Sequence, residues 1–370
     1  MQLRHRLCAA TVLFPALMFA QTAAPPTKSA PSTAASLGSY PVMSTAAKNR
    51  ARQLFEYFES GQSAHLYAAF SEQMKKSSGG SVQLTTVSKK IGSEWGREVK
   101  MLGENFAPDM LATNTIYSRF SQFAKSKDAI YTILAIDQQG QVALLRFSPA
   151  PQPSGNRYVD YKDTIKLRLP FDGDWFVYNG GRDIYQNSNA YREAERYSLM
   201  FTFLKGGRPY SGDGSKNEDY YCYGQPVLAT ADGTVVLVNN TFADNVPGRV
   251  EEIMPTGNRV LVSHANHEYS LFMHLKQNSI KVKTGQKVKA GQTVGECGNS
   301  GNSPAPHFEY RLPNSSGRPL PETVPAQFID YVADGVPVTI GEPLRGQTVR
   351  NASPPPATSA VATLPAAERR

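Results

Sequence analysis

The chain has 370 residues, of which 40% are hydrophobic, and this length is enough for two ordinary domains with tails. Its formal net charge of +8 suits contact with an anionic surface, and no nucleic-acid recognition motif accompanies the basic residues. Beyond the first twenty residues no segment is apolar enough to cross a bilayer, which argues against an integral membrane protein.

The N-terminus has the pattern of a secretory signal. Arg4 and Arg6 precede an apolar run over residues 7–20, and small residues near its end predict cleavage after Ala20. The alternative is a membrane anchor, but the run is shorter than the ~20 residues that a membrane span needs. We therefore expect residues 1–20 to be a signal peptide and the mature chain to be exported, to the periplasm or the extracellular space.

Residues 21–45 are rich in Ala, Pro, Ser and Thr, which predicts a disordered linker. The compact unit that follows, residues 46–150, begins with helical spacing. The pattern predicts helices over 46–59 and 84–95, with a further helix between them. The apolar residues of that middle helix are spaced four apart: Leu66, Phe70 and Met74.

The second half of this unit changes to a strand-like pattern. Residues 129–136 and 141–147 are joined by Asp137-Gln138-Gln139-Gly140, a hairpin turn, so the order of elements predicts an α+β domain. The run from Phe55 to Trp95 resembles the cone-shaped domain of nuclear-transport-factor-like folds. The resemblance implies a cone whose interior is either a ligand pocket or a packed aromatic core.

The second half of the chain is dominated by short β segments. Residues 151–194 are expected to form a connector with a strand at 165–171, and residues 195–335 to form an all-β domain with glycine-bearing turns. The proline-containing segment 343–370 is expected to be a disordered tail.

An ordered series of motifs runs from Gly224 to Leu312. It comprises Ala231-Asp232-Gly233-Thr234-Val235, Phe272-Met273-His274-Leu275, a glycine-spaced hairpin from Val282 to Gly295, Gly298-Asn299-Ser300-Gly301-Asn302-Ser303, and Pro306-His307-Phe308-Glu309. This series resembles the lysostaphin/LytM-type zinc metallopeptidases, which cut the peptide cross-links of bacterial cell walls. The resemblance implies a β-sheet domain of that type, related to duplicated-hybrid folds. Lipoyl and biotin carrier domains share the hairpin, but the modified lysine at a turn tip is not evident here.

The family's chemistry needs three zinc ligands and two further histidines. By resemblance, His274 and His307 match those two further histidines. Glu309 replaces the last histidine of a His-x-His element, and Arg196 and Met200 stand where a His-x-x-x-Asp element belongs. A guanidinium does not bind zinc and a thioether binds it poorly. We therefore expect His274 and His307 to be remnants of a catalytic site and no metal to be bound, Glu309 being the one candidate ligand left at the positions that the family uses.

Four other residues are candidates to rebuild a metal site, namely Glu218, Asp219, His264 and His267. A new site would need several ligands to arise together with correct geometry. His267 also occupies a turn position that favours glycine, so it is either mildly strained or newly exposed.

The cysteines give a prediction about covalent structure. Cys8 leaves with the signal peptide, and export permits disulfides, so we predict that Cys222 and Cys297 pair. Closing a loop of about 75 residues would contribute roughly 4 kcal/mol in the chain-entropy model. The alternative is two buried free thiols.

The sequence is compatible with two functions, one of a binding or regulatory protein and one of an enzyme. The first is a non-catalytic pseudoenzyme of the cell envelope that binds peptidoglycan or regulates a cell-wall hydrolase, with no cofactor. The alternative is an active zinc metalloendopeptidase that cleaves peptidoglycan cross-links, with Glu309 among its zinc ligands.

Overall fold

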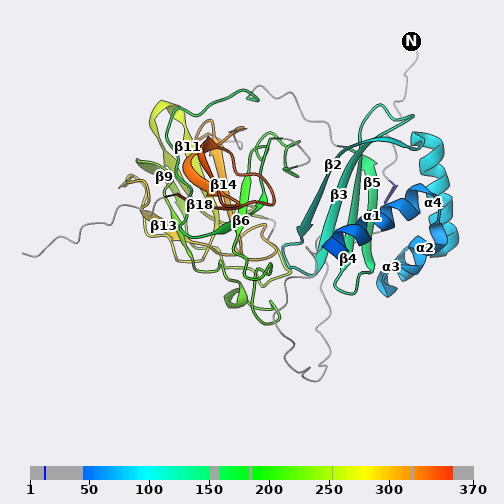
Figure 1. Cartoon of the computed structure of the whole chain (residues 1–370). Coiled ribbons are helices and arrows are strands. Elements are labelled where there is room, and N and C mark those ends of the chain that lie inside the picture. Colours follow the sequence, from blue (N-terminus) through cyan, green and yellow to red (C-terminus); the bar gives the residue numbers. More distant parts are fainter. Residues whose placement is uncertain are drawn as a thin grey trace, which may run out of the picture.

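The computed structural model describes residues 45–352, except 151–157, 183–185, 252 and 318–320, together with Val12–Leu13 (Figure 1). The predicted signal peptide, linker and final tail residues lie largely outside this range. Two units follow one another along the chain, a helix-and-sheet unit and a second unit built from strands. None of the helices in the described ranges is both long and apolar enough to span a membrane.

The first unit has its helices before its sheet, as the α+β prediction states. The helices are α1 (Thr45–Glu59), α2 (Ser63–Ala68), α3 (Glu72–Ser77) and α4 (Gly80–Trp95). The strands are β2 (Glu98–Pro108), β3 (Asn114–Phe123), β4 (Ile130–Asp137) and β5 (Val142–Pro149). They form an antiparallel sheet in the order β1-β5-β4-β3-β2, where β1 is Val12–Leu13. Figure 1 shows the helices gathered at one side of this sheet, and their apolar sides share one buried core with it.

The middle helix of the prediction is two short helices instead. Phe70 leaves the helical path and forms a bridge with Val142 in β5, and the hydroxyl of Ser71 accepts the backbone N–H of Met74 at 3.2 Å to begin α3. The apolar residues at four-residue steps reach the same core from two helices and the link between them.

The second unit is an 11-stranded sheet with a separate two-stranded ribbon. The path of the large sheet is β12-β9-β10-β11-β14-β7-β6-β18-β16-β17, with β15 paired to β14, and the ribbon is β13-β8. The strands of the large sheet are β6 (Trp175–Asn179), β7 (Leu199–Thr202), β9 (Gly233–Asn239), β10 (Asn258–Ser263), β11 (Tyr269–Leu275), β12 (Lys287–Val288), β14 (Phe308–Pro313), β15 (Thr323–Val324), β16 (Phe328–Ala333), β17 (Val336–Gly341) and β18 (Thr348–Asn351). The ribbon strands are β8 (Pro226–Leu228) and β13 (Thr293–Glu296).

The large sheet begins earlier and ends later in the chain than the sequence predicts. The expected connector contributes β6, and Leu167 lies buried in the second core with only an isolated bridge to Phe328, so no continuous strand spans 165–171. Likewise β18 lies within the expected tail and pairs with β16 and β6. These segments are ordered because their apolar side chains help fill that core.

Three neighbouring strands position the candidate site. On β14, Phe308 and Tyr310 point into the core, so Glu309 and Arg311 lie on the opposite face. Glu309 is directly opposite Met273 of β11 on one side and Met200 of β7 on the other.

Candidate functional site

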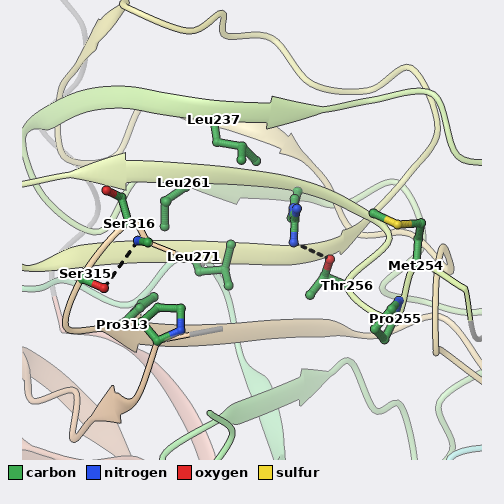
Figure 2. Close-up of a pocket in the computed structure, with 12 residues that line it drawn as sticks. Leu237, Met254, Pro255, Thr256, Leu261, Leu271, Pro313, Ser315 and Ser316 are labelled. Carbon is green, nitrogen blue, oxygen red and sulfur yellow. Dashed lines mark hydrogen bonds between the residues drawn. The ribbon is translucent and has the colours of Figure 1, made fainter. Parts of the chain in front are cut away.

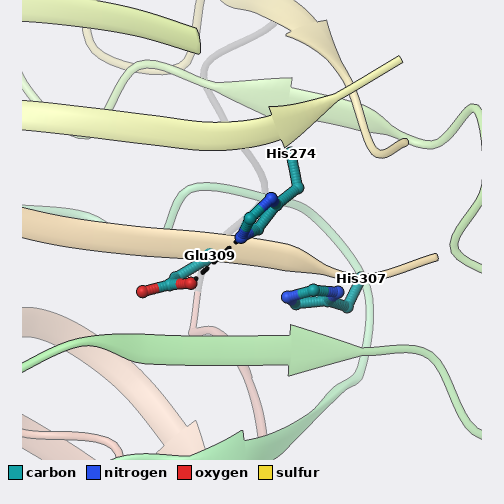
Figure 3. Close-up of side chains that lie close together, drawn as sticks. All are labelled: His274, His307 and Glu309. Carbon is teal, nitrogen blue, oxygen red and sulfur yellow. Dashed lines mark hydrogen bonds and ion pairs between the residues drawn. The ribbon is translucent and has the colours of Figure 1, made fainter. Parts of the chain in front are cut away.

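Three titratable side chains converge beside β14, as Figure 3 shows. They are His274 from the end of β11, His307 just before β14, and Glu309 within it. One potential ligand atom from each lies within 4.8 Å of the others. The three residues are 3%, 1% and 2% exposed, so the cluster is closed to solvent. The structure therefore brings together the two histidines and the carboxylate that the motifs single out.

His274 is held by backbone groups. Its φ of 57° lies in the left-handed region, which costs free energy for a residue with a Cβ. Its backbone N–H donates to the carbonyl of Thr256 at 3.2 Å, and its Nδ1 lies 2.8 Å from the carbonyl oxygen of Ser300. Since a carbonyl only accepts, Nδ1 carries a hydrogen, and Nε2 faces the cluster.

His307 presents an open nitrogen to the same space. Its Nδ1 lies 2.9 Å from the carbonyl oxygen of Ala305 and 3.0 Å from Ser303 Oγ, which orients the ring. Its Nε2 is buried and has no hydrogen-bond partner among the described residues. Burial, and then the neighbouring His274, lower the pKa of His307 to about 3, so the ring is neutral at physiological pH.

Glu309 is engaged at both oxygens. Its Oε2 lies 3.1 Å from Nε2 of His274, and its Oε1 accepts Nε–H of Arg311 at 2.8 Å. Burial acts to raise the pKa of Glu309, but the Arg311 guanidinium and the His274 hydrogen bond outweigh it, and the pKa falls to about 2. Arg311 also donates to the carbonyl of Ala194 at 3.1 Å, so a buried ion pair anchors the carboxylate.

The donor set does not suit a tightly held divalent cation as it stands. Glu309 and His274 satisfy one another, the second carboxylate oxygen faces a fixed positive charge, and His307 Nε2 alone is open. Across the sheet Glu309 faces the thioether of Met200. Arg196, which stands where the resemblance places a histidine ligand, is buried and donates from Nε to the carbonyl of Ala190.

The other candidate ligands lie apart from this cluster. The ring of His264 is held between Ser270 Oγ and the carbonyl of Asp232, at 2.8 and 2.7 Å. His267 is exposed with a φ of 61°, which agrees with the strain expected at that turn. Within the described ranges, neither these residues nor Glu218 and Asp219 join a group that could hold a metal.

Two glycines beside the cluster allow two backbone segments to approach each other closely. Gly257 and Gly301 have φ values of 57° and 80°. A Cβ on Gly301 would lie 2.4 Å from the nitrogen of Gly257, and a Cβ on Gly257 would lie 2.4 Å from the carbonyl oxygen of Ser300. That oxygen is the acceptor that orients His274, so the close approach supports the site directly.

The predicted disulfide between Cys222 and Cys297 is not present in the structure, where both residues are free thiols. Both are fully buried, and the neighbouring Cys222 thiol acts on the Cys297 thiol. The Cys222 thiol donates to the carbonyl oxygen of Pro306 at 3.1 Å. Burial raises the pKa of Cys297, which keeps its sulfur protonated and unreactive.

A groove of about 380 Å³ lies on the same face of the sheet, beyond the cluster. Figure 2 shows its aliphatic floor, which Leu237, Leu261 and Leu271 supply from β9, β10 and β11. Thr256, whose carbonyl holds His274, lies in one wall. The pattern of motifs did not predict this groove, because its floor residues lie on three strands whose register the sequence does not specify.

Comparison with known proteins identifies the region that contains these features. Residues 216–320 match the model of peptidase family M23. The chain is 32% identical over 98 residues to lipoprotein NlpD of Yersinia enterocolitica, a match that covers 26% of this chain and 88% of that protein. It is 33% identical over 98 residues to the murein hydrolase activator NlpD of Escherichia coli strain K12, covering 26% of this chain and 22% of that protein.

A peptidase is among the relatives as well. The chain is 37% identical over 98 residues to the peptidoglycan DD-endopeptidase ShyA of Vibrio cholerae serotype O1, covering 26% of this chain and 19% of that protein. The chain spans a fifth or less of the length of several curated relatives that it matches, ShyA among them.

Proposed function

Because this chain belongs to peptidase family M23, we propose that it is a non-catalytic member that regulates a cell-wall hydrolase or binds peptidoglycan in the cell envelope. The observation that carries the proposal is the pairing of Glu309. The residue in the place of a zinc-ligating histidine has both oxygens engaged, one by His274 and the other by Arg311. The groove beside this closed cluster remains open to a partner.

Similarity supports the regulatory part of the proposal. One relative is named a murein hydrolase activator, which is a regulatory role on the same kind of domain. The aliphatic floor of the groove favours an apolar segment of a protein partner, because peptidoglycan strands are rich in hydroxyl, amide and carboxylate groups that need polar contacts. The exported location stays part of the proposal, since it depends on the predicted signal peptide.

Binding is tested with the mature protein, purified sacculi and a cell-wall amidase or endopeptidase from the same organism. We expect the protein to co-sediment with sacculi or to raise the rate of the hydrolase. Leu237→Glu places a charge on the groove floor and should reduce the effect by about tenfold or more. Val236→Glu is the matched control, because Val236 is exposed on the same strand but does not line the groove. Absence of both effects in the unaltered protein contradicts the proposal.

Catalysis is tested by metal analysis and by digestion of cross-linked muropeptides. We expect well under one zinc ion per chain after dialysis against zinc and no cleavage. The alternative, an active zinc endopeptidase, is favoured by the spacing of the three donor atoms and the open Nε2 of His307. It requires about one zinc per chain and cleavage that His307→Ala abolishes, and that result would replace our proposal.

A further inference from the structure

A pocket of about 400 Å³ lies in the first unit between helix α1 and strand β2, and we call it the α1–β2 pocket. Its lining includes Phe55, Glu56 and Glu59 of α1, Val99 and Met101 of β2, and Arg119 of β3. β2 is the last strand in the order of its sheet, so its outer side has no neighbouring strand in the described part of the chain (Figure 1). The space between the helices and the sheet is a packed core, in which Phe58 and Phe147 stack with ring centroids 4.0 Å apart. The pocket therefore lies beside this core, at the edge of the sheet.

The arginines of the pocket are already paired with carboxylates of the protein. Arg119 donates from Nη2 to both oxygens of Glu98, at 2.8 and 2.9 Å. Its guanidinium lies over the ring of Phe55, 4.4 Å from the centroid, and its Nε is buried. Arg52 donates from Nε to Glu104 at 3.1 Å. Because both guanidinium charges are balanced in this way, the pocket is not built to receive an anion.

Two carboxylates of α1 have no such partner. Within the described ranges, neither Glu56 nor Glu59 forms a salt bridge with a basic side chain. Glu59 is half-buried, and its Oε2 accepts the backbone N–H of Glu98 at 3.1 Å. Burial raises the pKa of Glu59, and the nearby Glu98 carboxylate adds to the rise, while the Glu98 N–H and Arg119 only partly offset it. A positive charge beside Glu59 would stabilise its ionised form, and the protein does not supply one in a direct pair.

The opposite wall of the pocket is apolar and exposed. Val99 and Met101 of β2 are 56% and 46% exposed, although both are large hydrophobic residues within a strand. Val99 is the extra residue of a β-bulge, because the pairing with β3 shifts between Glu98 and Lys100. Bulges turn side chains away from their regular direction in a sheet. An apolar wall opposite unpaired carboxylates suits an alkyl chain that ends in a positive charge, since the chain leaves water while the charge meets a carboxylate.

We propose that the α1–β2 pocket binds a primary ammonium group on a short alkyl chain, either a free alkylamine or the lysine side chain of a peptide. The ammonium group meets Glu59, and the chain lies against Val99 and Met101. Glu56 and Glu59 are three residues apart on α1 and so share one side of the helix, which suits a group with three N–H donors. Lys100 also lines the pocket, but it is exposed and the two carboxylates outnumber it. The inference concerns the first unit and does not rest on the proposed function.

The test compares the affinity of the full mature chain for matched probes by ligand-observed NMR titration. n-Pentylamine represents a free amine, and Nα-acetyl-lysine methylamide represents a lysine side chain within a peptide. n-Pentanol and pentanoate have the same alkyl chain without a positive charge. We expect at least one of the two ammonium probes to bind about fivefold or more tightly than pentanol, and the tighter of the two identifies the source of the ligand. Equal affinities for both ammonium probes and pentanol, or tighter binding of pentanoate, would overturn the proposal.

A change of charge at Glu59 tests its role directly. Glu59→Gln keeps an acceptor for the Glu98 N–H but removes the negative charge, and it should weaken pentylamine binding by about fivefold or more without affecting pentanol. Glu94→Gln is the matched control, because Glu94 is exposed on α4 and does not line the pocket. An equal loss of affinity in both variants would contradict the assignment.

The pH dependence gives a further readout. Since the ammonium probe stays protonated and prefers the ionised carboxylate, its binding should strengthen as the pH rises through the raised pKa of Glu59, and Glu59→Gln should reduce this dependence. The other charged groups that line the pocket with Glu59 come from α1, β2 and β3, and they are Arg52, Glu56, Glu98, Lys100 and Arg119.

A second variant tests the apolar wall. Met101→Ser changes an exposed side chain, so it should leave the fold intact, which circular dichroism reports. It should weaken pentylamine binding severalfold and leave the weaker binding of methylamine unchanged, because only the longer chain reaches the wall. Unaltered pentylamine affinity in both Glu59→Gln and Met101→Ser would overturn the proposal, whatever the outcome of the sacculus and hydrolase assays.

Discussion

Single residues in the candidate site owe their charge to what surrounds them. His307 and Glu309 are equally buried, yet one is neutral and the other ionised, because only the carboxylate is paired with the Arg311 guanidinium and hydrogen-bonded to His274. Breaking such a pair by removing one partner leaves an uncompensated buried charge, which is strongly destabilising. Arg311 therefore contributes to the stability of the sheet as well as to the chemistry of the site.

The depressed pKa of His307 predicts a loss of stability in acid. In the unfolded chain His307 is protonated below about pH 6.5, whereas in the folded chain it is protonated only below about pH 3. The free energy of unfolding should fall by up to about 1.4 kcal/mol per pH unit across this range, and urea unfolding at several pH values measures it. His307→Gln should flatten the dependence, while His267→Gln, at an exposed position, should not. Equal slopes for both variants would refute the assignment.

At this scale the motifs predicted the site residues but not their partners. His274, His307 and Glu309 stand in short local motifs, so the sequence alone indicates them. The Ser300 carbonyl and the Arg311 guanidinium act through the register of β11 and β14, which local sequence does not encode.

At the scale of single elements, the prediction and the structure differ mainly at the ends of helices and strands. Helical spacing locates α1 and α4, but it merges α2 and α3, because residues on both helices and their link face one core. β2 was not predicted, since Val99 and Met101 are exposed and the strand lacks a regular alternation of buried and exposed residues.

The N-cap residue of α3, Ser71, gives a testable prediction about the boundary between α2 and α3. Ser71→Ala removes the acceptor of the Met74 N–H and should lower the free energy of unfolding of the first unit by about 1 kcal/mol. Chemical denaturation followed by circular dichroism measures the change. Ser93→Ala in α4 is the control, because Ser93 is exposed and its hydroxyl bonds only within its own helix, to the carbonyl of Lys90. A loss in the control as large as in Ser71→Ala would show that the cap is not the cause.

Over the whole molecule, the order of an α+β unit before a β-sheet unit was predictable, because hydrophobic periodicity changes along the chain. The extent of the second sheet was not, since β6 and β18 join it from segments that read as a connector and a tail. The small apolar contact between Ala112 of the first unit and Tyr210 and Tyr220 of the second was also beyond prediction, because it brings together turn and loop residues far apart in sequence, with no shared period.

The fold of the second unit predicts how its thiols react. Cys222 and Cys297 are fully buried, so neither should react with Ellman's reagent in the native protein. In guanidinium chloride both should react, and the intact mass should correspond to two thiols. A mass two hydrogens lower, with no reaction after denaturation, would show that the purified protein carries the bond that the structure lacks.

The meeting of Gly257 and Gly301 has a consequence for evolution. A Cβ on Gly257 would push against the Ser300 carbonyl that orients His274, and a Cβ on Gly301 would push against the backbone of Gly257. Among orthologues that retain the histidine, both positions should therefore stay glycine.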